Sequence, residues 1–287
     1  MHRFIDAAAH NPHWAWYAIA DSAQHRDLPG ALRLASNLAR CLFNTPEDSP
    51  LAAHAPHLVR IEPPSTASRA WTWIMRNADR NPCITLLAST ADFDTLYQHL
   101  QQFTEVSMPD GDDMFFAFWD PAILGTLMGQ PDDATLYVRG PVLNVAQRAR
   151  LCRHVAAWWY WDRHGELRSL QLLDSAPDQA NLPLELNQCQ VDDLIEASVP
   201  DHVLYHIELN QPQLVAEIDP QQRYSLVRQH LENAREIKLE AMIDLVNYVC
   251  AALIYQERFH TDPGIRSLLT KVKNGDLTLP QALMDMP

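Results

Sequence analysis

The stretch CITLLAS, residues 83–89, is a continuous apolar run of strand length. Such a run, with no polar alternation, is typical of a strand buried on both faces. Helical patterns flank it, ASRAWTWIMRNA at 67–78 and DFDTLYQHLQQF at 92–103. Strand-like segments lie beyond them, HLVRI at 57–61 and MPDGDDMFFAFW at 108–119, where a turn leads into the strand. This β-α-β rhythm predicts an α/β fold with a mainly parallel sheet flanked by helices.

The distribution of tryptophan predicts two lobes. All eight tryptophans lie at or before residue 161, and the chain from about 190 has a helical pattern. We expect an α/β lobe over 1–175 and a mostly helical lobe over 176–287, joined at the loop 175–188. One uninterrupted helix over 220–260 would be about 55–60 Å long, so a break there stays open.

Composition and charge limit the class of protein. With 47% hydrophobic and 20% charged residues, the 287-residue chain is globular in type. Its formal charge of −14 repels nucleic acid and anionic lipid, so we expect neither as a partner. Scattered cysteines and the lack of a long apolar segment lead us to expect a cytoplasmic protein with no membrane-spanning segment.

Motifs for catalysis, cofactors or metals are not found in the sequence. The eight glycines form no phosphate-binding loop and no nucleophile elbow. The best histidine pair, His202 and His206, has helical spacing but no third ligand marked by spacing. We therefore expect no cofactor, no metal and no enzyme activity.

Asp120 allows two interpretations. It follows an aromatic run and precedes Pro121, which fits the N-cap and first residue of a helix. It also fits the carboxyl end of a strand, where α/β proteins place ligand sites. An enzyme using Asp21 and Asp120 as paired acids at strand ends is therefore the main alternative function. A structural subunit of an assembly is another.

Acidic residues recur every four positions in the helical lobe. Like charges at this spacing repel on a helix. The repeat either forms an acidic ridge for a basic partner or is a solvated outer face. Its members are Glu232, Glu236, Glu240 and Asp244.

Five short segments in the first half of the chain occur in a recognisable order. They are WYAIADSA (16–23), CLFNTPED (41–48), APHLVRI (55–61), His99-Leu100 and FFAFWDPAIL (115–124). Together, over about residues 14–140, they resemble a bacterial family long catalogued as a domain of unknown function. That family serves type VI secretion as effector adaptors or chaperones, the Tap or Tec proteins. The chain departs from the family at Ala117 and Ala122, where arginine is usual.

The resemblance implies a cytoplasmic, non-enzymatic protein that holds a cognate toxin and helps load it on the VgrG spike. We expect aromatic strand ends to frame the toxin-binding groove, with two carboxylates at its rim. A second hypothesis places partner selection on the acidic ridge. The groove residues are Trp14, Trp16, Phe118 and Trp119, with Asp21 and Asp120 at the rim.

Overall fold

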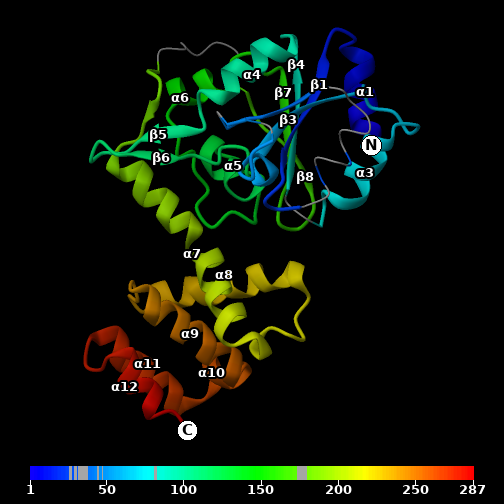
Figure 1. The fold of residues 1–287 in the computed structure, drawn as a ribbon. Helices are drawn as coiled ribbons and strands as arrows, with labels where there is room; N and C mark the ends of the chain where they lie inside the picture. Colours follow the sequence, from blue (N-terminus) through cyan, green and yellow to red (C-terminus); the bar gives the residue numbers. More distant parts are fainter. Residues whose placement is uncertain are drawn as a thin grey trace. The chain divides into compact units, whose positions relative to one another are not determined.

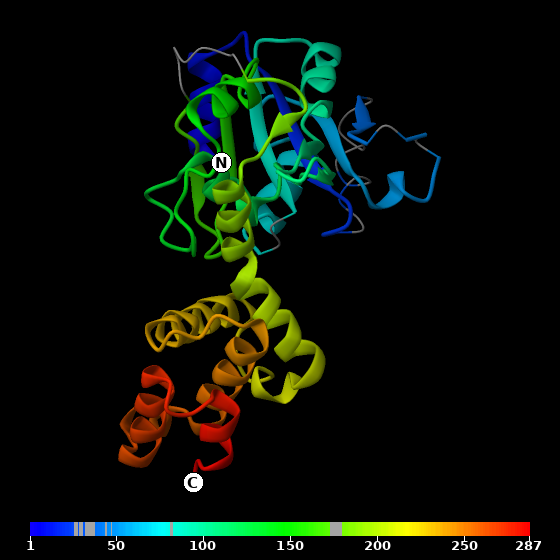
Figure 2. The same ribbon diagram turned by 90° about the vertical axis from the view of Figure 1, so that its left-hand side faces the viewer.

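The computed structural model describes residues 1–25, 28, 31, 38–43, 45–46, 48–80, 83–172 and 180–287. They form two compact units, Met1–Leu194 and Ile195–Pro287, shown in Figures 1 and 2. The division falls later than the expected 175/176 because the start of helix α7 (Gln188–Asn210) belongs to the first unit. There Val191 joins the core, and the side chain of Gln190 donates to the Val142 carbonyl at 2.8 Å.

A six-stranded sheet forms the centre of the first unit, in the order β2-β3-β1-β4-β7-β8. Every neighbouring pair in it is antiparallel. The expectation of a mainly parallel sheet is therefore wrong. The strands are β1 (Ala15–Asp21), β2 (Ala39–Cys41), β3 (Pro56–Ile61), β4 (Ile84–Ser89), β7 (Ala157–Trp161) and β8 (Leu167–Ser169).

The position of β1 explains the error. Strand β3, helix α3 (Arg69–Asn77) and strand β4 do follow the β-α-β rhythm, and β3 and β4 run in the same direction. However, β1 lies between them and is antiparallel to both, with Ile19 opposite Leu58 on one side and Thr85 on the other. The rhythm gives the direction of consecutive strands, but it does not say which strands are neighbours.

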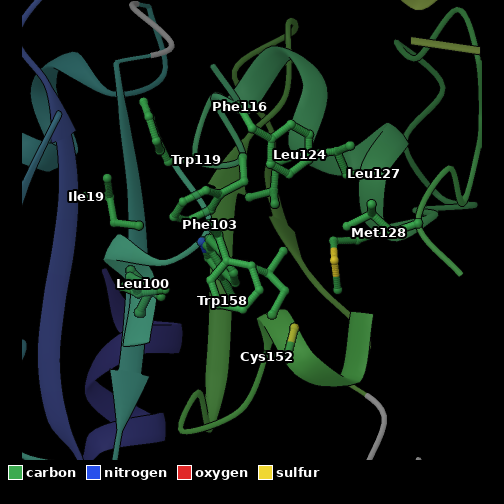
Figure 3. Close-up of a cluster of buried hydrophobic side chains, with 14 of the residues drawn as sticks. Ile19, Leu100, Phe103, Phe116, Trp119, Leu124, Leu127, Met128, Cys152 and Trp158 are labelled. Carbon is green, nitrogen blue, oxygen red and sulfur yellow. The ribbon is translucent and has the colours of Figure 1, made fainter. Parts of the chain in front are cut away.

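Helices cover both faces of this sheet (Figure 1). Helices α1 (His2–His10) and α3 lie on one face; α4 (Phe93–Gln101), α5 (Pro121–Met128) and α6 (Val145–Leu151) lie on the other. Alternate residues of β1 point to opposite faces of the sheet. Trp16 therefore joins the core beneath α1 and α3, which we call the first core, and Ile19 joins the second core, beneath α4, α5 and α6. Figure 3 shows the second core, in which Ile19 lies across from Phe103 and Trp158.

A small sheet beside the second core has the order β6-β5-β9. Its strands are β5 (Glu105–Ser107), β6 (Asp113–Phe115) and β9 (Leu184–Glu185). Strands β5 and β6 form an antiparallel hairpin, and the turn expected at Asp110-Gly111 is confirmed, with a φ of 90° at Gly111. A positive φ of this kind suits glycine, which has no Cβ. The hairpin leaves β6 at the edge of the sheet.

The second unit is helical. It contains the later part of α7, followed by η2 (Pro212–Leu214), α8 (Pro220–Glu236), α9 (Met242–Tyr255), α10 (Glu257–Thr261), α11 (Pro263–Asn274) and α12 (Leu279–Met284). The long helical pattern is broken after Glu236, where Lys238 has a φ of 65°. Arg235 stabilises the chain at this break, because its guanidinium donates to the Leu239 carbonyl at 2.9 Å. No helix within the described ranges is long and apolar enough to span a bilayer.

Candidate functional site

The four aromatic residues expected to frame one groove instead form two pairs on opposite faces of the sheet. Trp16 is 1% exposed and its ring stacks on Trp159 at 5.4 Å, within the core under α1 and α3. Trp14 packs against that same core, whereas Phe118 and Trp119 are buried on the opposite face of the sheet. Strand alternation explains why Trp14 and Trp16 stay together, because residues two positions apart share one face of a strand, here the face covered by α1 and α3.

Asp21 and Trp119, far apart in the sequence, are in direct contact. The indole Nε1–H of Trp119 donates to Asp21 Oδ2 at 3.1 Å. The other carboxylate oxygen of Asp21 accepts the backbone N–H of Ala23 at 2.9 Å. Asp21 is the last residue of β1, and strand alternation places its side chain on the face of the sheet that carries Trp119. Its carboxylate thus joins the first and last segments of the sequence pattern.

Asp120 is the N-cap of α5. Its Oδ1 accepts the backbone N–H of Ala122 at 2.8 Å, and Pro121 occupies the first turn. The interpretation of Asp120-Pro121 as the N-cap and first residue of a helix is therefore confirmed.

The acidic repeat does not form a continuous ridge, because the helix that would carry it stops after Glu236. Glu232 is paired with Arg228 at 3.0 Å within α8. Glu240 lies in the connection between α8 and α9, and Asp244 lies in the first turn of α9. A carboxylate in a first helical turn is stabilised by the helix dipole, and Asp244 occupies such a position.

An open pocket of about 610 Å³ lies next to Trp119. We call it the aromatic pocket. Phe115 is 50% exposed in it and makes edge-to-face contacts with Phe43 at 5.0 Å and Trp119 at 5.6 Å. Leu51, on the same pocket, is 56% exposed. Its lining residues are Phe43, Thr45, Leu51, Gln101, Gln102, Thr104, Glu105 and Phe115.

The edge strand β6 reaches this pocket through Phe115. Backbone bonds join β6 and its ends to β5 through Phe116 N–H to Thr104 O (2.9 Å) and Met108 N–H to Asp112 O (2.7 Å). In an antiparallel pair the bonded residues alternate, so the backbone groups of Asp113 and Phe115 point away from β5. Within the described part of the chain, no strand pairs with that side of β6. An exposed edge of this kind can add a strand from another chain.

The charge around the aromatic pocket is negative. Glu105 lines it, and Asp110, Asp112 and Asp113 lie exposed in the adjoining turn and edge strand. The lining residues, all of them described, include neither Lys nor Arg. A segment that combines apolar with basic side chains is therefore the complementary ligand.

Sequence reasoning did not select Phe115, Phe43 or Leu51. Phe115 lies in an aromatic run that looks like a core strand. The available signal is the turn at Asp110-Gly111, since a hairpin that starts there can place Met114 and Phe115 on an exposed edge. Asn44 and Glu47, which belong to the segment containing Phe43, lie outside the described residues.

Groups of metal ligands and reactive thiols are two further kinds of chemical site. No group of three or more His, Cys, Asp or Glu among the described residues could hold a metal ion, so no third ligand joins His202 and His206 there. Burial raises the pKa of the Cys83 and Cys152 thiols to about 12, which keeps both protonated at neutral pH.

A comparison with protein families places the pocket within a recognised domain. Residues 16–136 match a family described as a domain of unknown function (DUF4123). This match covers less than half of the chain but includes every residue of the aromatic pocket. No curated protein and no solved structure matches the chain.

Proposed function

We propose that the protein is an adaptor or chaperone for a type VI secretion toxin. It binds an exposed segment of the toxin before secretion and helps load the toxin on the VgrG spike. The aromatic pocket beside the free edge of β6 is the observation that carries this proposal. A half-exposed phenylalanine held by two other rings is a surface that a bound segment would cover.

The toxin segment binds in an extended conformation. Its backbone pairs with the outward groups of Asp113 and Phe115, and one apolar side chain enters the pocket. Burying that side chain contributes about 1.5–3 kcal/mol. Basic residues of the segment lie near Glu105 and Asp113, and their charge favours correct partners over acidic ones.

Two further observations support the adaptor assignment. The sequence pattern resembles that of the adaptor family, and the match at 16–136 covers the same part of the chain. In addition, the carboxylates of Asp21 and Asp120 hold Trp119 and the first turn of α5, so they position the residues next to the pocket.

Capture of the tagged protein from its host, with identification of the co-purifying proteins, tests the function. We expect a toxin in stoichiometric amount. The purified toxin should then bind the double variant Phe115→Ala/Leu51→Ala at least tenfold more weakly, the loss expected for about 1.4 kcal/mol. The matched control is Val145→Ala, which truncates another half-exposed apolar residue in the same unit. Equal binding by the double variant and the control would contradict the use of this pocket.

The enzyme alternative makes a different prediction. It requires turnover of a small molecule that is lost in Asp21→Asn or Asp120→Asn variants that remain folded. Such a loss, together with failure to capture any partner from cells that make the secretion apparatus, would replace the adaptor proposal.

A further inference from the structure

A second pocket lies within the helical unit and belongs to no site described above. It has a volume of about 730 Å³, within the range of ligand-binding pockets. Residues of η2, α8, the end of α9 and α10 line it, and we call it the helical-unit pocket. Leu214, Ile218, Leu226 and Leu253 supply much of its apolar wall.

Two stacked histidines lie in the wall of this pocket. The rings of His230 and His260 are 5.8 Å apart and nearly parallel, at 11°. His230 is 9% exposed, and its buried Nδ1 has no hydrogen-bond partner in the described structure. Burial and the neighbouring His260 lower the pKa of His230, which favours its neutral form. A buried polar atom without a partner is destabilising and calls for a physical explanation, of which a bound ligand is one.

The potential of the pocket favours a positive charge. Glu217 and Glu257 line it, and the described lining residues include no Lys or Arg. The carboxyl end of α9 also lies here, with the helix stopped by Gln256 at a φ of 51°. The negative end of a helix dipole adds to the two carboxylates. Arg223 of α8 is paired with Glu208, and Arg258 of α10 is paired with Asp262.

The surrounding elements determine the form of the ligand. From Ile195 onward the described residues contain helices and connections but no strand, so no free edge is offered for backbone pairing. A helix satisfies its own backbone hydrogen bonds and needs only an apolar surface and a matching charge. A helical segment can therefore bind here through its side chains alone.

We propose that the helical-unit pocket binds an amphipathic helix of a protein partner, with apolar residues in the pocket and one Lys or Arg against Glu217 and Glu257. This site is separate from the aromatic pocket, and it gives the protein a second point of attachment. The inference does not depend on the identity of the toxin.

The test uses the full chain and a synthetic helical peptide of about 14 residues. The peptide carries Leu at i, i+3 and i+7 and Arg at i+4, and its ends are acetylated and amidated. Titration followed by NMR should give saturable shifts of signals from residues that line the pocket. A peptide with Glu in place of Arg should bind at least tenfold more weakly. No saturable shift at millimolar peptide, or equal affinity for both peptides, would overturn the proposal.

Protein variants locate the contact. Glu217→Arg/Glu257→Arg should weaken binding of the Arg peptide at least tenfold. Asp276→Arg/Asp285→Arg makes the same change in net charge at exposed positions outside the pocket, and it should leave the affinity unchanged. Equal effects of the two double variants would mean that only net charge matters and would overturn the site.

One more measurement separates this proposal from a simpler one. N-acetylarginine amide should bind far more weakly than the peptide. Equal affinity would show a site for a free cation and overturn helix binding. All these outcomes are independent of toxin capture through the aromatic pocket.

Discussion

At the scale of the residue, the contact between Asp21 and Trp119 has the most consequences. It joins the end of β1 to the segment that enters α5, and Trp119 in turn supports Phe43 and Phe115. A hydrogen bond to a charged group contributes about 1.5–3 kcal/mol. We expect a double-mutant cycle of Asp21→Ala and Trp119→Phe to give a coupling energy of at least about 0.5 kcal/mol in urea unfolding. Strictly additive losses would mean that the contact does not stabilise the protein.

His99 should make stability depend on pH. Burial lowers its pKa to about 4, with repulsion from His154 adding to the effect, while its Nε2 bonds the Leu151 carbonyl at 3.1 Å. The folded state therefore disfavours the proton, whereas the unfolded chain takes it up near pH 6.5. Stability is lost as pH falls from about 6.5 to 4, by an amount on the order of 3 kcal/mol.

The variant His99→Gln isolates this effect, since its amide can still donate to Leu151. Urea unfolding of both proteins between pH 7 and pH 4 is the measurement. The free energy of unfolding of the variant should fall less steeply over this range. Parallel curves would assign the acid sensitivity to other groups.

At the scale of the element, Gly125 explains how α5 fits against the sheet. A Cβ at this position would collide with the hydroxyl of Tyr160 on β7. That hydroxyl donates to Asp133 Oδ2 at 2.8 Å and so cannot move freely. Gly125→Ala should therefore destabilise the protein by about 1–3 kcal/mol, although alanine is the better helix former by about 1 kcal/mol.

Removal of the hydroxyl tests that explanation. In thermal or urea unfolding, Gly125→Ala should cost clearly less in a Tyr160→Phe background than in the wild type. The same cost in both backgrounds would show that another contact, such as that with Leu136, is responsible.

Individual helices, strands and turns were more predictable from the sequence than the order in which the strands pair. The run at 83–89 does contain a central strand with every residue buried, and the Asp110-Gly111 turn and the Asp120 cap are where the pattern placed them. These features depend on local chemistry. The insertion of β1 between β3 and β4 depends on long-range pairing, which spacing along the chain does not record. The exposure of Phe115 was missed for a related reason: the Asp110-Gly111 turn indicates a hairpin, but the sheet order decides whether β6 lies at an edge.

At the scale of the whole molecule, the adaptor proposal predicts that charge and shape complementarity act on different steps of toxin binding. A formal charge of −14 attracts basic molecules from a distance, and salt screens this attraction. In that proposal the aromatic pocket acts only at contact, where it slows dissociation. Under the adaptor proposal, raising NaCl from about 0.05 M to about 0.5 M should lower the association rate constant about tenfold and change the dissociation rate constant little.

Phe115→Ala should have the opposite signature in the same binding kinetics. Its association rate constant should equal that of the wild type at each salt concentration, because the charge is unchanged, while its dissociation rate constant rises. An association rate independent of salt would show that the acidic surface does not guide the partner. A Phe115→Ala variant that slows association alone would mean that the pocket forms contacts before docking. Kinetics on one pair of proteins therefore separates the role of the surface charge from that of the pocket.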